Sequence, residues 1–289
     1  MNDMHIAKYW KDDIDNAVRC GLCPHRCLIR DNAFGLCGAR KNNDGILLAA
    51  TYGHISSIAL DPIEKKPLSM FNPGKNILSI GSFGCNLNCG FCQNFEISKE
   101  YSDILFEAKK MMPNEIVSIA IDTMRRNNIG VAFTYNEPLV GYEFVRDCAV
   151  LTRDAGLLNV LVTNGFINPD PLADLLPVID AMNIDLKGFT KDFYSSVGGV
   201  FEDVKETIVM SAKQCHVEVT TLVIPNENEN DIEDIAKWLS SINDGIPLHL
   251  TRFYPRYRYA GKSPTSREKM IRLSGIAKKY LKNVIVGNM

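Results

Sequence analysis

Three cysteines, Cys85, Cys89 and Cys92, stand within one short segment of the sequence. On a loop, their thiolates can converge on one metal centre. A structural zinc site normally has four closed ligands, and a [4Fe–4S] cube usually takes four cysteines. Because only three lie close together, the spacing predicts a cluster with one iron open to an outside ligand. A zinc site that borrows a distant fourth ligand is the alternative.

A second group of cysteines lies near the N-terminus with the spacing C-x2-C-x3-C-x9-C, at Cys20, Cys23, Cys27 and Cys37. Four ligands of this kind can close a tetrahedral zinc site or complete a second [4Fe–4S] cluster, and the spacing does not decide between them. The metal would help this glycine-rich segment to fold, since the segment has little apolar core of its own.

The bulk composition limits the class of protein. Seven of the nine cysteines fall in these two groups, which favours metal or redox chemistry over a disulfide framework. We expect Cys148 and Cys215 to be core thiols. A formal charge of −2 gives no reason to expect binding to nucleic acid or to anionic membranes. With no bilayer-spanning apolar run and no secretory signal at the N-terminus, we expect a cytoplasmic protein.

Short β-branched runs alternate with amphipathic stretches from Asn76 onward. Such alternation implies right-handed βαβ crossovers and a parallel sheet. We therefore predict an α/β fold, a partial (β/α)6 TIM-like barrel or a doubly wound sheet, over residues 76–289, after a small Cys-rich module over residues 1–75. The strands are predicted at 77–83, 130–134, 158–162, 181–185, 217–224 and 247–253, and the helices at 113–127, 139–155, 170–176, 202–213, 231–242 and 266–281.

Unusual residues follow all six predicted strands, at 84–86, 135–138, 163–165, 185–187, 225–226 and Arg252. In parallel α/β folds the chemistry gathers at the carboxyl ends of the strands, so this coincidence predicts one site. Strand alternation points Asp185 and Lys187 to the same side. The basic and aromatic residues near the last strand, His249, Arg252 and 254–259, are either a grip for an anionic substrate or an ordinary loop surface.

The spacing C-x3-C-x2-C, with Phe91 just before the third cysteine, resembles the cluster motif of the radical S-adenosylmethionine (SAM) superfamily. The resemblance implies that the open iron chelates the amino and carboxylate groups of SAM and that Phe91 packs on the adenine. Members commonly carry Gly-Gly-Glu where this chain has Tyr135-Asn136-Glu137. Only Glu137 and the following proline match, which implies that Glu137 holds the SAM amino group. A helix N-terminal acid is the alternative.

Two further segments resemble the pyruvate formate-lyase activating enzyme and its relatives. The first is Asp185-Leu186-Lys187, and the resemblance implies that this segment binds the ribose hydroxyls and the carboxylate of SAM. A plain ion pair is the alternative. The second is the turn Thr163-Asn164-Gly165, and the resemblance implies that this turn lies close to the cofactor. The alternative is that Gly165 is there only because the turn needs a positive φ.

The whole chain resembles the radical SAM member of the AmmeMemoRadiSam group, through segments 20–37, 54–67, 79–98, 135–139 and 286–288. Membership implies a genomic link to Memo-type proteins and hence a Memo-type partner. The expected electron donor is flavodoxin or ferredoxin. The leading hypothesis is an enzyme that cleaves SAM reductively to a 5′-deoxyadenosyl radical, which takes hydrogen from an unidentified small molecule or protein. The alternatives are a glycyl-radical-enzyme activase and a metal-binding interaction protein without catalysis.

Overall fold

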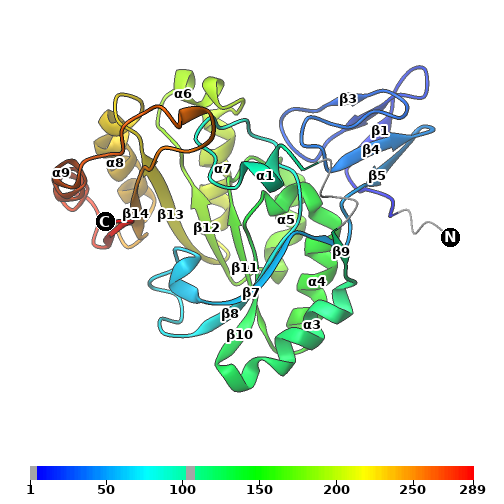
Figure 1. Cartoon of the computed structure of the whole chain (residues 1–289), viewed down its shortest axis with the longest axis horizontal. Helices are drawn as coiled ribbons and strands as arrows, with labels where there is room; N and C mark the ends of the chain where they lie inside the picture. The colour runs from blue at the N-terminus through cyan, green and yellow to red at the C-terminus, as the bar shows by residue number, and fades with distance from the viewer. Residues whose placement is uncertain (1–4, 102–107) are drawn as a thin grey trace.

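The computed structural model describes residues 5–101 and 108–289. Its main sheet has eight strands in the order β15-β14-β13-β12-β11-β10-β8-β7 (Figure 1). Seven of them are parallel, and six of these confirm the predicted strands to within about two residues. They are β8 (Asn76–Gly81), β10 (Asn128–Phe133), β11 (Leu158–Thr163), β12 (Ala181–Asp185), β13 (His216–Val223) and β14 (Leu248–Arg252).

A helix follows each of these strands before the next strand begins, which confirms the predicted (β/α)6 pattern. The helices are α3 (Pro113–Asp122), α4 (Tyr142–Asp154), α5 (Pro169–Leu175), α7 (Phe201–Ser211), α8 (Ile232–Asn243) and α9 (Arg267–Ala277). Shorter helices, α1 (Phe95–Ser98) and α6 (Lys191–Ser196), lie in the loops at the carboxyl ends of β8 and β12. The partial barrel therefore positions these loops at one end of the sheet (Figure 1).

Two edge strands were not predicted. β15 (Val284–Gly287) runs parallel to β14, and β7 (Ser57–Pro62) runs antiparallel to β8. β7 belongs to the segment that we assigned to the N-terminal module, so the main sheet begins before residue 76. No residue of either strand is fully buried. β7 lacks the apolar run of an internal parallel strand, and the apolar run of β15 is only three residues long, Val284 to Val286, which is why the sequence pattern missed them.

The two faces of the sheet bury different partners. Alternate strand residues such as Leu78, Val131 and Leu161 face the large core shared with the helices. The residues between them face inward and pack on the segment after β7. This smaller inner core consists of Ile63, Leu68, Ile77, Ala132, Val160 and Ala181. Residues 63–71 thus fill the lower part of the barrel, below the strand ends that carry the predicted site.

Glu218 of β13 fastens this inner segment to the barrel wall. Its side chain is fully buried and accepts hydrogen bonds from the backbone N–H groups of Ser69 (3.0 Å) and Met70 (2.8 Å). The rings of His216 (2.9 Å) and His249 (2.6 Å) complete the set. Burial opposes ionisation of Glu218, but these hydrogen bonds outweigh it and lower the pKa to about 2.

The lowered pKa predicts a specific acid sensitivity. A carboxylate whose folded pKa lies below its unfolded value of about 4.5 adds stability above that value, and loses it as the pH falls toward 2. Glu218→Gln should lower the free energy of unfolding by about 3 kcal/mol at pH 7. The deficit should shrink between pH 5 and 3 in urea titrations, whereas the exposed Glu202→Gln should show no such trend. A deficit that is independent of pH would refute the assignment.

The N-terminal module precedes β7 and lies to the right in Figure 1. Its strands are β1 (Trp10–Asp12), β2 (Val18–Cys20) and β3 (Leu28–Ile29), which form one antiparallel sheet, and the hairpin β4 (Arg40–Asn43) and β5 (Ile46–Ala49). A further strand, β6 (His54–Ile55), pairs with β9 (Lys109–Lys110). Fully buried Arg40 forms an ion pair with Glu143 of α4, and this pair ties the module to the barrel.

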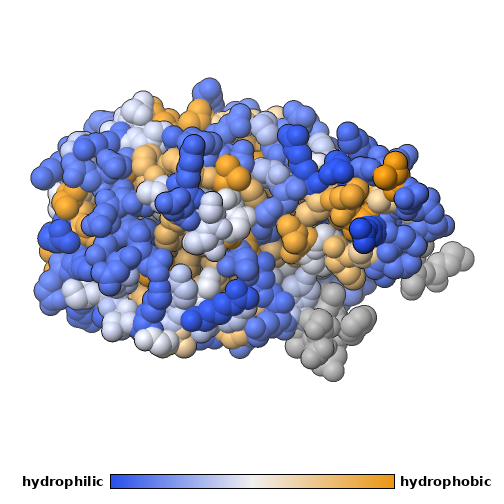
Figure 2. Space-filling model, turned by 90° about the horizontal axis from the view of Figure 1, so that it is seen from above, coloured by the Kyte–Doolittle hydropathy of each residue, from blue (hydrophilic) through white to orange (hydrophobic). Residues whose placement is uncertain are grey.

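The surface of the module is unusually apolar in places (Figure 2). Its exposed large apolar side chains are Ile6, Ile14, Leu28, Phe34, Leu36 and Ile46.

Across the described ranges, no helix has both the length and the hydropathy needed to cross a bilayer.

Candidate active site

The three-cysteine segment is the loop that follows β8 at the carboxyl end of the barrel. Gly84 opens it with a φ of +91° and donates its N–H to the carbonyl of Ile97 (3.0 Å). Lys99 reaches back from beyond α1 and donates to the carbonyl of Cys85 (2.8 Å). Cys92 donates its N–H to the carbonyl of Cys89 (3.2 Å), which forms a tight turn. The loop is therefore fixed at both ends before any metal binds.

Burial favours the protonated form of two thiols of this loop, Cys85 and Cys89. It raises the pKa of Cys85 to about 12, and the nearby carboxylate of Glu137 adds to the rise. Burial also raises the pKa of Cys89 to about 11, although the ammonium group of Lys187 opposes this. Metal ligation requires the thiolates, so iron must displace these protons.

The donor set of the three-cysteine loop suits a [4Fe–4S] cube. The thiolates that hold a [4Fe–4S] cube each bind a different iron, so they stand further apart than the ligands of a single ion. Three soft thiolates on one loop fit such a cube and leave its fourth iron without a protein thiolate from this loop.

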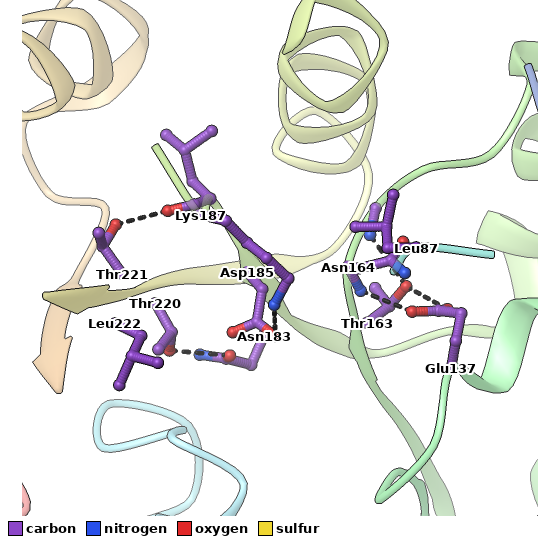
Figure 3. Close-up of polar contacts among 12 residues, drawn as sticks. Leu87, Glu137, Thr163, Asn164, Asn183, Asp185, Lys187, Thr220, Thr221 and Leu222 are labelled. Atoms are coloured by element: carbon purple, nitrogen blue, oxygen red, sulfur yellow. Dashed lines mark hydrogen bonds and ion pairs between the residues drawn. The ribbon is translucent and has the colours of Figure 1, made fainter. Parts of the chain in front are cut away.

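Glu137 lies at the end of β10 and joins it to the end of β11 (Figure 3). One carboxylate oxygen accepts hydrogen bonds from the N–H of Leu139 (3.0 Å) and the hydroxyl of Thr163 (2.6 Å). The other accepts from the N–H of Asn164 (2.7 Å). Burial raises the pKa of Glu137 to about 7 against the effect of these hydrogen bonds. The side chain also caps the turn that precedes α4, which is the helix N-terminal interpretation that the sequence left open.

Asn164 brings the β11 turn against the cysteine loop. Its amide nitrogen donates to the side chain of Asn86 (2.9 Å) and lies 3.6 Å from the Cys85 sulfur. Gly165, the next residue, has a φ of +70°, as the alternative interpretation of this turn expected. The turn thus contacts the three-cysteine loop directly.

Asp185 and Lys187 lie beside this group at the end of β12 (Figure 3). The ammonium group of Lys187 is 2.9 Å from the carboxylate of Asp185. Burial opposes the charge on Lys187, but the carboxylate of Asp185 outweighs it and raises the pKa of Lys187. Tyr194 of α6 accepts the N–H of Lys187 (3.1 Å) and helps to hold the pair. The ammonium group of Lys187 therefore stays charged next to the cysteine loop.

Aromatic residues from distant segments surround Phe91. Its ring lies 5.7 Å from that of Tyr259 and 6.3 Å from that of Phe193. Tyr259 also donates its N–H to the carbonyl of Gly90 (3.2 Å), and Tyr257 stacks on Phe95. The loop after β14 therefore covers the cysteine loop. The predicted basic and aromatic residues therefore do not form one patch. Tyr257 and Tyr259 contact the cysteine loop, whereas His249 lies inside the barrel and is hydrogen-bonded to Glu218.

A cluster of charged and aromatic groups in the barrel was not predicted as part of the site. Asp61 of β7 contacts the ammonium group of Lys66 (2.8 Å) and the hydroxyl of Tyr135 (2.7 Å). Lys66 is only 3% exposed and lies over the Tyr135 ring. Tyr135 itself has a φ of +72°, and its carbonyl accepts a hydrogen bond from Asn94, two residues after Cys92. The available signal was segment 54–67, which contains Asp61 and Lys66 and was one of the segments singled out in the sequence.

The four N-terminal cysteines line one small cavity against the barrel. Burial raises the pKa of Cys37, and the nearby Cys20 and Cys27 thiols contribute to the rise. The guanidinium group of Arg40 lies 3.8 Å from the Cys20 sulfur. The fold thus brings together all four residues that the spacing singled out. Cys148, by contrast, is buried alone in the core, and Cys215 is partly buried just before β13.

Removing the Glu137 side chain should damage both the fold and the site. Glu137→Ala leaves the three buried donors without an acceptor, so we expect the free energy of unfolding to fall by about 3 kcal/mol or more. The β10 and β11 ends should also separate, and SAM affinity should fall by at least about tenfold. Urea denaturation and equilibrium binding measure the two effects. The matched control is Glu206→Ala, on an exposed helix surface. Wild-type stability in Glu137→Ala would refute the positioning role.

The chain belongs to the radical SAM superfamily. A family model described as the radical SAM superfamily matches residues 79–239, which run from β8 to α8. Its cofactors are therefore a [4Fe–4S] cluster and SAM.

Individual relatives agree with the family assignment. An uncharacterized protein of Methanocaldococcus jannaschii is 41% identical and covers 99% of this chain and 86% of its own length. The pyruvate formate-lyase 1-activating enzyme of Escherichia coli (strain K12) is 24% identical over 68% of this chain and 86% of its own length. The structure of Streptococcus suis SuiB bound to S-adenosylmethionine has a TM-score of 0.54 and 12% identity, over 70% of this chain and 47% of that one, so it shares the fold.

Proposed function

We propose that this protein is a radical SAM enzyme of the AmmeMemoRadiSam group, in which Cys85, Cys89 and Cys92 hold the cluster. When bound and reduced, the cluster supplies one electron that cleaves the sulfur–C5′ bond of SAM, giving methionine and a 5′-deoxyadenosyl radical that takes hydrogen from a substrate. The observation that carries the proposal is the convergence of the cysteine loop, Asn164 and the Asp185–Lys187 pair at one end of the barrel.

The polar residues of the site have separate tasks in this proposal. Lys187 binds the SAM carboxylate and Asp185 the ribose hydroxyls, since the two side chains form an ion pair beside Cys89. Glu137 holds the SAM amino group, because three hydrogen bonds fix its carboxylate and leave one of about four acceptor sites free. Asn164 holds the turn beside the Cys85 sulfur, and Phe91 packs on the adenine. The loop after β14 keeps water away from the reacting atoms.

The substrate is an unidentified small molecule or protein. A glycyl-radical-enzyme activase is the second candidate, supported by the similarity to the pyruvate formate-lyase activating enzyme. The N-terminal module, residues 1–75 in the proposed division, covers part of the site and favours a substrate other than a glycyl radical loop. Flavodoxin or ferredoxin is the proposed electron donor and a Memo-type protein the proposed partner. The proposed location is the cytoplasm.

Product analysis tests this function. The reconstituted protein, reduced anaerobically with dithionite and mixed with SAM, should form 5′-deoxyadenosine and methionine. A Memo-type protein would then be incubated with the active enzyme in deuterated solvent and examined for hydrogen exchange or a change in mass. Extracts that contain candidate substrates would be tested in the same way. A protein that holds its cluster and forms no 5′-deoxyadenosine under any of these conditions is a binding protein, and the proposal fails.

A further inference from the structure

Lys99 is a cation at the three-cysteine loop that the proposed function does not use. It directly follows α1, and its side chain turns back to the first cysteine of the loop. The ammonium group donates to the carbonyl of Cys85 at 2.8 Å. The N–H of Cys85 donates in turn to the carbonyl of Cys37 at 3.2 Å. Lys99 therefore fixes one of the two backbone groups that hold Cys85 in place.

The charge of Lys99 acts on more than one ligand of the loop. Its side chain is partly buried, so water screens the ammonium group less than it would on an open surface. Burial raises the pKa of Cys85 and of Cys89, and the ammonium group opposes the rise at both thiols. The field of Lys99 therefore reaches the place where these thiolates would hold a cluster.

The other charged groups around the loop offset one another. Lys187 also faces the loop, but its ammonium group is 2.9 Å from the carboxylate of Asp185. The carboxylate of Glu137 acts on the first cysteine with the sign opposite to that of Lys99, and its pKa of about 7 leaves it only partly ionised at neutral pH. Among the residues with described positions, no carboxylate forms an ion pair with Lys99. Its positive charge is thus the one that the loop receives without a paired carboxylate.

Further hydrogen-bond donors gather on the sulfur of Cys85. The N–H of Leu87 lies 3.4 Å from this sulfur, and the amide nitrogen of Asn164 lies 3.6 Å from it. Donors to the sulfurs and nearby positive charge both favour the reduced, more negative state of a cluster. Cys85 thus receives donors at its sulfur and at its carbonyl, and of these donors only Lys99 carries a full charge.

We propose that Lys99 is a positioning residue that raises the reduction potential of the cluster held by Cys85, Cys89 and Cys92. Reduction adds one negative charge, which the ammonium group stabilises. The electron comes from the low-potential donor protein of the proposed function, and Lys99 itself exchanges neither an electron nor a proton. The inference rests on the ligands assigned in the proposed function and is independent of the reaction that follows reduction.

A redox titration of the full-length, reconstituted protein without SAM tests this role. The readout is the electron paramagnetic resonance signal of the reduced cluster that is absent in Cys89→Ala. In Lys99→Met the equilibrium constant for reduction should fall by about tenfold, which lowers the midpoint potential by about 59 mV for one electron. Lys99→Arg restores the charge and should restore the potential. The matched control is Lys278→Met, which removes an exposed lysine after α9 and should leave the potential unchanged.

Lys99→Gln separates the charge from the hydrogen bond. Glutamine offers an N–H donor for the Cys85 carbonyl but carries no charge, so the potential should fall as it does in Lys99→Met. A wild-type potential in Lys99→Gln would leave Lys99 as a structural contact and overturn the proposal. An unchanged potential in Lys99→Met at full iron content, or a loss of iron in all three variants, would overturn it as well.

The remaining outcomes are also decisive. If Lys99→Met alone loses its iron, the comparison of Lys99→Gln with Lys99→Arg decides in the same way. If the potential depends on Lys99 as expected but the wild type never cleaves SAM, the proposed function fails and the role of Lys99 stands.

Discussion

Replacing Cys89 by alanine is expected to abolish both the cluster of the three-cysteine loop and the cleavage of SAM. Cys89 is one of only three thiols on the loop and faces Lys187, so no neighbouring cysteine of the loop can take its place. A cube held by two thiolates exposes a second iron and is lost during anaerobic gel filtration. Iron analysis and chromatographic detection of 5′-deoxyadenosine measure the two losses, and the product should fall to the background level.

Cys215→Ala is the matched control for this experiment. Cys215 is partly buried just before β13 and belongs to neither cysteine group. The control should keep the iron content and the turnover of the wild type. Turnover that survives in Cys89→Ala, or that is equally lost in Cys215→Ala, would show that the ligands of the catalytic cluster have been assigned wrongly.

Replacing Lys187 by methionine is expected to weaken SAM binding while the cluster stays intact. The change keeps the length of the side chain but removes the cation that faces Asp185, and it leaves that carboxylate without its partner. Removing one partner of a hydrogen-bonded charge pair at a binding site, here the Lys187 cation that would meet the SAM carboxylate, costs about 2 kcal/mol of binding free energy at the low end. The low end applies because Lys187 and Asp185 are partly exposed. The dissociation constant of SAM should therefore rise by about 30-fold.

The readouts for Lys187→Met separate a binding role from a structural one. Iron content should match that of the wild type, and Lys187→Arg should recover part of the affinity, because it restores the charge. Lys191→Met removes an exposed lysine from the start of α6 and should change neither quantity. Unaltered SAM affinity in Lys187→Met would leave Asp185 and Lys187 as a plain ion pair, the alternative that the sequence left open.

The sequence predicted the main elements of the barrel because each internal parallel strand is a short apolar run followed by a helix of regular period. It also predicted that unusual residues would gather at the strand ends, since topology alone brings those ends together. The edge strand β7 could not be predicted in this way. Its residues are partly exposed, and it pairs only with β8. Neither apolar periodicity nor a connecting helix marks such a strand.

The contacts inside the site depended on packing that spacing does not reveal. The motif pointed to Glu137, but its three hydrogen-bond donors come from two different loops. The pairing of Asp61 with Lys66 and Tyr135 joins a strand of the N-terminal part to the end of β10. Similarly, the spacing of the four N-terminal cysteines gave no indication that Cys37 lies against Cys85. Long-range contacts of this kind follow from the fold.

Hyperfine spectroscopy of the reduced protein with labelled SAM tests the central claim most directly. If three cysteines hold the cluster and its fourth iron binds SAM, then SAM labelled with 15N at the amino group and 17O at the carboxylate should show magnetic coupling of both nuclei to the reduced cluster. The variant that lacks the four N-terminal cysteines should show the same couplings. A reduced cluster that is present in full and shows neither coupling at saturating SAM would contradict the account.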